Sequence, residues 1–337
     1  MNPFQRLISP RLPQAAVALS GEAASVVQLE RRGGGLAVRS AGLLPLPPGL
    51  VRPSFDEPNV ADASELAGAL SELLTSAGLA RRRRWSVGLP EASTRTSILT
   101  METAPASRAE AEEMLRWKTE RALGAPLDEL RVSRERLRPD AQGRARHLVA
   151  AVRLTVLAEY DQVFAALGWQ TGLVLPRHMG EAWWLMRDGG GAPSASGASD
   201  SLLVSSHAEG FTAVIMRGGA PLYVRAVICE TEDRADELYR FLLFYRDRNS
   251  PQAPDGADDL TEAPSPPPPP AFGEGIARML VAGTGIDESQ ASAIVEETLS
   301  ATPRPVQPAD LRLAFPSSEL DFRQIAAPAG LAALSWA

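Results

Sequence analysis

Hydrophobic and polar positions along the chain follow one pattern twice. Residues 17–29 form two largely apolar runs around a short polar turn, and they are followed by 32–41, which begins with Arg-Gly-Gly. The same pattern returns 185 residues later, in 202–214 and 217–227. Each copy reads as strand, tight turn, strand, Gly-Gly turn and strand. A repeat at so long an interval indicates a duplicated lobe and not a solenoid.

An amphipathic helix is predicted after each copy. After the first, Leu66, Leu70 and Leu74 recur at helical spacing, and after the second Leu238 and Leu242 do the same. Three strands and a helix, repeated, resemble the α/β fold of actin, Hsp70 and hexokinase. That fold is an actin-like ATPase fold with two duplicated lobes.

An extra α/β segment is predicted between the copies. It starts with strands at 85–89 and 94–99, continues with a helix opened by the capping box of Ser107 and Glu110, and includes a strand at 148–152. The predicted organisation is a tail (1–13), a first lobe (14–188) with an inserted small subdomain at about 85–153, a linker (189–200), and a second lobe (201–337) interrupted by a Pro-rich segment (249–271).

The charge balance and the cysteine content restrict the function classes. The formal net charge is -7 and the isoelectric point is about 5.2, which argues against a nucleic-acid binder. Cys229 is the single cysteine, so no disulfide can form within the chain. No stretch reaches the roughly 20 apolar residues of a membrane helix, and the N-terminus lacks the apolar region of a signal peptide. We therefore expect a cytoplasmic protein without a transmembrane segment.

Several motifs of known chemistry are missing from the sequence. There is no Gly-x-Ser-x-Gly nucleophile elbow, no Ser-His-Asp order and no Gly-x-x-x-x-Gly-Lys phosphate loop. His147, His178 and His207 stand apart from any cluster at metal-ligand spacing. We expect these histidines at surface or capping positions, and we predict no metal site.

A set of short motifs is spread over nearly the whole chain. They are residues 26–29 (VVQL), 44–49 (LPLPPG), 87–90 (VGLP), 114–120 (MLRWKTE) leading into 126–129 (PLDE), 148–152 (LVAAV), 202–227 and 283–285 (GTG). None is specific alone, but their order and spacing resemble the PilM family. Members of that family are actin-like proteins of type IV pilus assembly, related to FtsA.

The resemblance implies a nucleotide cleft between the lobes, and it also implies a partner. PilM-like proteins bind the cytoplasmic N-terminal tail of the inner-membrane protein PilN in a groove of the first lobe, and they join a platform that connects to the pilus motors. The chain would then be an adaptor in the cytoplasm, peripheral to the inner membrane. Trp117, which lies off the centre of its helix's apolar face, and Arg116 are the candidate contacts for the tail. Formation of a homo-oligomer is left open.

The resemblance also assigns positions in the nucleotide cleft. Nucleotide-binding relatives have an acid at the end of the first strand of each hairpin, which holds Mg²⁺, then glycine in the turn, and a lysine after the first hairpin. The corresponding residues here are Ala18 (acid), Ser20 beside Gly21 (glycine) and Ser25 (lysine) in the first hairpin, Ser205 (acid) and His207 (glycine) in the second, and Gly283, Thr284 and Gly285 in a third turn that keeps its glycines.

These substitutions predict a cleft that takes no cofactor. Phosphoryl transfer depends on the metal-binding carboxylates, so we expect no ATP hydrolysis and no enzyme activity. Glu22 and Glu209 follow the two turns and could replace the missing acids if the turns were rearranged, which keeps a nucleotide-binding ATPase that regulates assembly as an alternative. A further alternative is the cytoplasmic part of a type II secretion platform. It is disfavoured because such chains continue into a transmembrane helix, whereas this one ends at Ala337.

Overall fold

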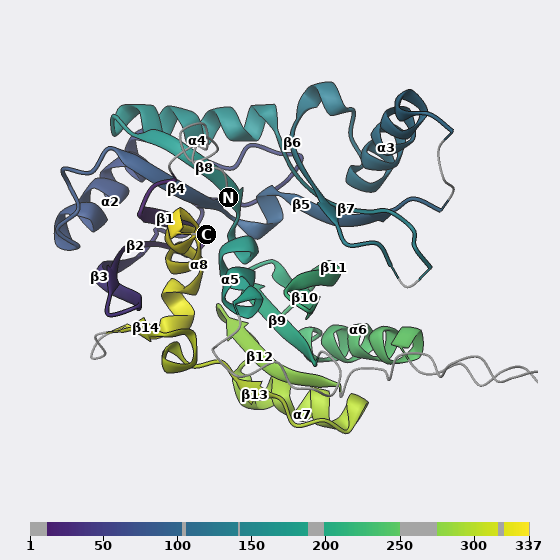
Figure 1. Ribbon diagram of the computed structural model, residues 1–337. Helices are drawn as coiled ribbons and strands as arrows, with labels where there is room; N and C mark the ends of the chain where they lie inside the picture. The colour runs from purple at the N-terminus through teal and green to yellow at the C-terminus, as the bar shows by residue number, and fades with distance from the viewer. Residues whose placement is uncertain are drawn as a thin grey trace, which may run out of the picture.

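Two lobes and a small third sheet make up the protein (Figure 1). The computed structural model describes residues 12–102, 106–140, 142–187, 199–249, 275–315 and 320–336. Most of the predicted tail, linker and Pro-rich segment lies outside the described residues. Among those residues, no helix combines the length and the apolar character needed to cross a membrane.

The first lobe is built on a mixed sheet with the strand order β14-β3-β2-β1-β4-β8. Helices α2 (Ala63–Ser76) and α4 (Leu154–Ala166) cover the face toward which Val17 and Leu19 point, and α8 (Phe322–Ala333) covers the opposite face with Ala16. Successive side chains of a strand point to opposite faces, so the central strand is buried on both sides. The strands are β1 (Ala15–Leu19), β2 (Ala23–Arg32), β3 (Gly35–Pro45), β4 (Arg84–Leu89), β8 (Gln170–Pro176) and β14 (Leu313–Ala314).

The second lobe has the sheet order β11-β10-β9-β12-β13. Helices α6 (Arg234–Asn249) and α7 (Glu288–Leu299) cover one face, where Leu202 and Val204 point, while Leu203 packs with α5 (Arg177–Met186) on the other. The strands are β9 (Asp200–His207), β10 (Gly210–Arg217), β11 (Ala220–Ile228), β12 (Ile276–Ala282) and β13 (Arg304–Pro305).

The strand order confirms the predicted duplication of the lobes, because β3-β2-β1-β4-β8 and β11-β10-β9-β12-β13 are equivalent series. The constant offset of 185 residues needs one correction. Ala18 pairs with Ser25 and Ser205 pairs with Thr212, so the first hairpins lie 187 residues apart. The Gly-Gly turns are 185 residues apart because β10 has 8 residues where β2 has 10.

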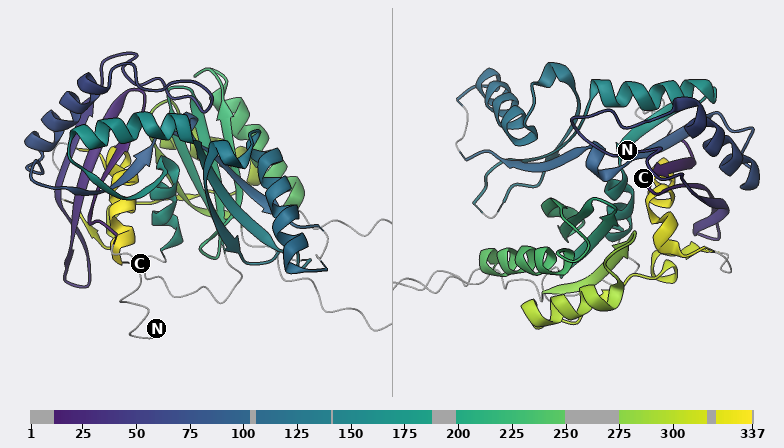
Figure 2. Two further views of the ribbon diagram at one scale, coloured as in Figure 1. Left: turned by 90° about the horizontal axis from the view of Figure 1, so that it is seen from above. Right: turned by 180° about the vertical axis from the view of Figure 1, so that it is seen from behind.

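Helices α5 and α8 cross between the two large sheets, and all views show them side by side (Figures 1 and 2). Each helix packs on the sheet of the other half of the sequence. Their backbones approach so closely that a methyl group on Gly330 would lie 1.7 Å from the carbonyl oxygen of Gly180. Trp184 of α5 also donates its indole N–H to the carbonyl of Ala326 in α8, at 2.8 Å. The lobes are therefore joined by a crossing that only glycine permits.

The small sheet has the order β5-β7-β6 and is covered by α3 (Arg108–Leu123). Its strands are β5 (Arg95–Thr100), β6 (Leu130–Leu137) and β7 (Arg146–Arg153). Strand β4, which we grouped with the inserted subdomain, lies in the first large sheet. Arg146 donates to the carbonyls of Pro221 (3.2 Å) and Leu222 (2.7 Å), so β7 is tied to β11 of the second lobe.

Candidate functional site

Three turns meet where the two lobes face each other. The Thr284 hydroxyl of the third turn donates to Glu22 Oε2 of the first hairpin turn, at 3.2 Å. Gly21 lies against the second hairpin turn, since a methyl group on it would be 3.3 Å from Glu209 Oε1. Arg234, buried at the start of α6, donates to the carbonyls of Ala208 and Thr284, both at 2.8 Å. The structure thus brings together the three turns that the sequence assigned to one cleft.

Ser20 closes the first hairpin turn on itself. Its Oγ accepts hydrogen bonds from the backbone N–H groups of Glu22 (3.3 Å) and Ala23 (3.0 Å), and it donates to the Ala23 carbonyl (3.1 Å). A phosphate in an actin-like cleft needs such turn N–H groups for itself. At Ser20, where glycine was expected, a side-chain oxygen already occupies them.

The positions assigned to the metal-binding acids carry no carboxylate. Ala18 is buried at the end of β1, beside Gly88 of β4 and opposite Ser25 of β2. Ser205, the matching residue of β9, is fully buried beside Ala282 of β12. Neither strand end supplies a Mg²⁺ ligand of the expected kind, and Ser25 supplies no ammonium group.

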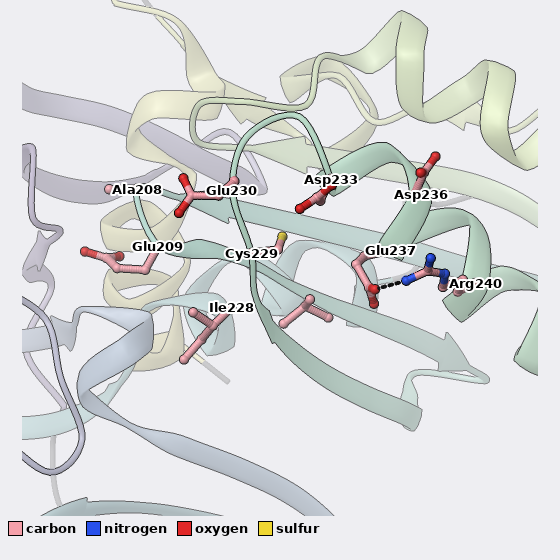
Figure 3. Close-up of a pocket in the computed structure, with 10 residues that line it drawn as sticks. Ala208, Glu209, Ile228, Cys229, Glu230, Asp233, Asp236, Glu237 and Arg240 are labelled. Carbon is pink, nitrogen blue, oxygen red and sulfur yellow. Dashed lines mark hydrogen bonds and ion pairs between the residues drawn. The ribbon is translucent and has the colours of Figure 1, made fainter.

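Carboxylates instead gather beside the second turn. A pocket of about 780 Å³ opens there between the end of β11 and the start of α6 (Figure 3). Arg240 is the single basic residue that lines it, and Arg240 is already paired with Glu237. A site of this sign repels polyphosphate. Among the described residues, no group of three or more His, Cys, Asp or Glu side chains is placed to hold a metal ion. The acidic residues of the pocket are Glu209, Glu230, Asp233, Asp236 and Glu237.

A second polar cluster lies buried behind the turns. Glu91, in the turn after β4, accepts hydrogen bonds from the backbone N–H and from Nδ1 of His178 in α5, each at 2.5 Å. It also accepts the Thr212 hydroxyl of β10, at 3.2 Å. Glu181, one turn further along α5, is fully buried and pairs with Arg177 at 3.1 Å. This buried cluster therefore joins the first lobe to the second.

The pKa values of Glu91 and His178 in the buried cluster shift in the directions expected when the two side chains form an ion pair. Burial would raise the pKa of Glu91, but the charge and hydrogen bonds of His178 lower it below the usual value. Burial would lower the pKa of His178, but the charge of Glu91 raises it. Burial raises the pKa of Glu181, and Arg177 only partly opposes this. The pair is thus most favourable with both partners charged.

The expected surface placement of the histidines is wrong at two positions. His178 is 2% exposed and belongs to the buried cluster, and His207 is 6% exposed with its Nδ1 3.0 Å from Glu209 Oε2. The partners of His178 escaped sequence reasoning because Glu91 lies 87 residues away. The sequence contained one signal for Glu91 itself: it is a carboxylate directly after the apolar residues 87–90, where the chain leaves the sheet between the lobes.

Trp117 lies far along the chain from these turns, on α3 of the small subdomain. Its ring is 56% exposed, and the Arg121 guanidinium lies 5.3 Å from the ring centroid. Arg116 pairs with Glu120 across one helical turn, at 3.5 Å. Trp117 is thus an exposed aromatic residue that stacks with one arginine of its own helix.

The duplicated sheets and the crossed helices define an actin-like ATPase fold. No family model and no curated protein matches the sequence. Among solved structures, the chain resembles one chain of the PilM-PilN type IV pilus biogenesis complex, with a TM-score of 0.71 and 20% identity over 97% of this chain and 99% of that chain. The fold predicted from the sequence is therefore confirmed along nearly the full length.

Two more solved structures share the fold at a greater distance. One is a Bacteroides thetaiotaomicron protein of unknown function with an actin-like ATPase fold (TM-score 0.47, 10% identity, 98% of both chains). The other is the cytoplasmic domain of EpsL, an inner-membrane component of the type II secretion system of Vibrio cholerae (TM-score 0.39, 15% identity, 85% of this chain and 94% of that chain).

Proposed function

We propose that this protein is a PilM-like adaptor of the type IV pilus machinery. The observation that carries the proposal is the likeness over 97% of the chain to a component of a PilM-PilN complex. The PilM-like sequence motifs, in their order and spacing, support the same assignment. The partner is the cytoplasmic N-terminal tail of a PilN-like inner-membrane protein, together with other proteins of the platform or its motors. The chain would work in the cytoplasm, against the inner membrane.

The outer surface of α3 is the proposed contact for the tail. Trp117 and Arg116 lie within the MLRWKTE motif, one of the segments that carry the resemblance. An exposed indole gains apolar burial when a peptide covers it, and Trp and Arg are the residue types that most often dominate binding energy at interfaces. Tryptophan has only two side-chain torsions, and the Arg121 guanidinium lies 5.3 Å from the ring centroid, so little side-chain entropy would be lost on binding.

The adaptor is proposed to work without hydrolysing ATP. Ala18 and Ser205 offer no carboxylate to Mg²⁺, and the Ser20 hydroxyl uses the turn N–H groups that a phosphate would need. Glu209 adds negative charge beside the same turn. Each feature acts against a different part of the Mg-nucleotide, so a change at one of them alone does not restore binding.

Isothermal titration tests both parts of the proposal. The full chain is titrated with a synthetic N-terminal tail of the PilN-like protein encoded nearby, with and without Mg-ATP. We expect binding of equal strength in both conditions. Binding that requires ATP would favour the regulated ATPase, and a failure to bind in either condition would refute the pilus assignment.

A matched pair of variants locates the contact. Trp117→Ala is expected to weaken tail binding about 30-fold, the effect of losing an aromatic hot spot worth about 2 kcal/mol. Phe244→Ala is the control, because Phe244 is also an exposed ring on a helix, 5.4 Å from an arginine four residues later, but lies in the second lobe. Equal loss in both variants would place the tail elsewhere.

A further inference from the structure

A small basic pocket lies at the end of the first lobe away from the three turns. It has a volume of about 230 Å³ and is formed by the β2–β3 turn and by the C-terminal ends of α5 and α8. In Figure 2 this turn and the end of α8 lie at the same end of the first lobe. Arg31 and Arg187 contribute two guanidinium groups to its lining, and Trp183 and Trp336 contribute two indole rings.

The arginines around this pocket have no acidic partner among the described residues. Within the part of the chain that the structure describes, neither Arg31 nor Arg187 makes an ion pair or a side-chain hydrogen bond. The same holds for Arg32 in the turn and for Arg312, whose carbonyl accepts the N–H of Leu36 at 3.0 Å beside the turn. In a chain of net charge -7, this end of the molecule is locally basic. Its electrostatic complement is an anionic partner.

One indole at the pocket also lacks an acceptor. The Nε1 atom of Trp183 is buried and makes no hydrogen bond to any described residue. The neighbouring indole of Trp184 shows the usual arrangement, with its N–H donated to the carbonyl of Ala326 at 2.8 Å. A buried donor without an acceptor is costly, so a ligand oxygen that reached it from the pocket lined by the Trp183 ring would satisfy it.

We propose that this pocket binds the phosphate group of an anionic phospholipid and so holds this end of the protein against a membrane surface. Guanidinium groups bind phosphate with two parallel hydrogen bonds, and an indole N–H adds a third donor. Tryptophan rings favour the headgroup level of a bilayer, where one edge is apolar and the other is wet. An acidic protein would satisfy the charges as well, but it would not explain two indole rings beside a site with room for a single headgroup.

Vesicle co-sedimentation of the full chain tests the proposal. The vesicles contain phosphatidylcholine alone or mixed three to one with phosphatidylglycerol, and they contain no protein, so the result does not depend on the proposed PilN-like partner. We expect binding to the mixed vesicles only. Arg31→Ala with Arg187→Ala should lower the partition coefficient about 25-fold, at about fivefold for each arginine. Trp183→Phe, which keeps an aromatic ring and removes the buried unsatisfied N–H, should weaken binding to the mixed vesicles.

The control for charge is Arg134→Ala with Arg136→Ala, two exposed arginines of β6 on the small sheet. An equal loss of binding in this control would show an unspecific effect of net charge and overturn the proposal. Binding of inorganic phosphate without binding of mixed vesicles would overturn the lipid assignment.

Discussion

The contact between the lobes has a buried part and a part that faces solvent, and the two are built differently. In the buried cluster, Glu91 satisfies His178 and Thr212 at once. At the turns, Glu22 accepts the Thr284 hydroxyl at 3.2 Å and Glu209 lies 3.0 Å from His207, and both glutamates are more exposed than Glu91. Actin-like enzymes use the turns for chemistry. In this chain the buried ion pair lies behind the turns in a structural position, and Arg234 ties the second and third turns together through their carbonyls.

The largest effect is expected from Glu91→Ala. It would leave the buried imidazole of His178 and the hydroxyl of Thr212 without an acceptor. Removal of one partner of a buried ion pair costs about 3–5 kcal/mol. Urea unfolding would measure the loss, and Glu91→Gln, which keeps an acceptor oxygen, should lose less. A loss below 1 kcal/mol in Glu91→Ala would show that the lobes are held by other contacts.

Gly330→Ala should have the next largest effect and lower the free energy of unfolding by about 3 kcal/mol. The added methyl group would overlap the backbone of α5 and force the crossed helices apart. Gly68→Ala on α2 is the matched control, since a methyl group there meets no atom within 4 Å. The control should gain about 0.5–1 kcal/mol from its lower unfolded-state entropy. Thermal unfolding of both variants gives the comparison. Changes of the same sign would contradict a close crossing at Gly330.

The pH dependence of stability tests the buried cluster without a change in its packing. The pKa of Glu91 is lowered, so its contribution exists above its usual pKa of 4.5 and is lost as the pH falls through the folded value. The pKa of His178 is raised, so its contribution exists below 6.5 and is lost as the pH rises through the folded value. Burial raises the pKa of Glu181, so ionisation of this carboxyl costs stability. The free energy of unfolding therefore also falls at this residue as the pH rises above 4.5.

The free energy of unfolding should therefore be higher near pH 6 than near pH 8.5, by about 1.4 kcal/mol for each unit by which the pKa of His178 is raised. In Glu91→Gln the imidazole has no carboxylate partner, so this fall toward alkaline pH should shrink. Urea unfolding at both pH values measures the difference. The same fall in the variant and the parent would assign it to other groups.

Much of this architecture was accessible from the sequence because it depends on local pattern. Apolar runs bounded by polar turns predicted the central strands, and the paired glycines predicted the turns at 33–34 and 218–219. The repeat showed the duplication, although two extra residues in β2 shifted the register at the first hairpin. The second and third turns lie together because they follow the neighbouring strands β9 and β12 of one sheet, whereas the first turn belongs to the other sheet and reaches them only through the packing of the two lobes.

The remaining features depend on tertiary packing, which no local pattern encodes. The pair of Glu91 and His178 joins elements 87 residues apart and obeys no motif spacing. The contact of Gly180 with Gly330 depends on each helix packing against the sheet of the other half. The use of the turn N–H groups by the Ser20 hydroxyl requires the backbone geometry of the turn, and the sequence showed only that a glycine was missing.

The smallest effects are expected at the turns, where they separate two causes for the proposed absence of nucleotide binding. Glu209→Gln removes one charge from a half-buried side chain, so stability should change by no more than about 0.5 kcal/mol. A ligand at 100 times its dissociation constant stabilises a protein by about 2.7 kcal/mol, so 1 mM Mg-ATP would reveal a 10 μM site in a thermal shift. We expect no shift in the parent and none in Glu209→Gln, because Ala18 and Ser205 still supply no metal ligand. A thermal shift in Glu209→Gln but not in the parent would show that repulsion by the Glu209 carboxylate prevents nucleotide binding. The missing acids at Ala18 and Ser205 would then be the less important cause.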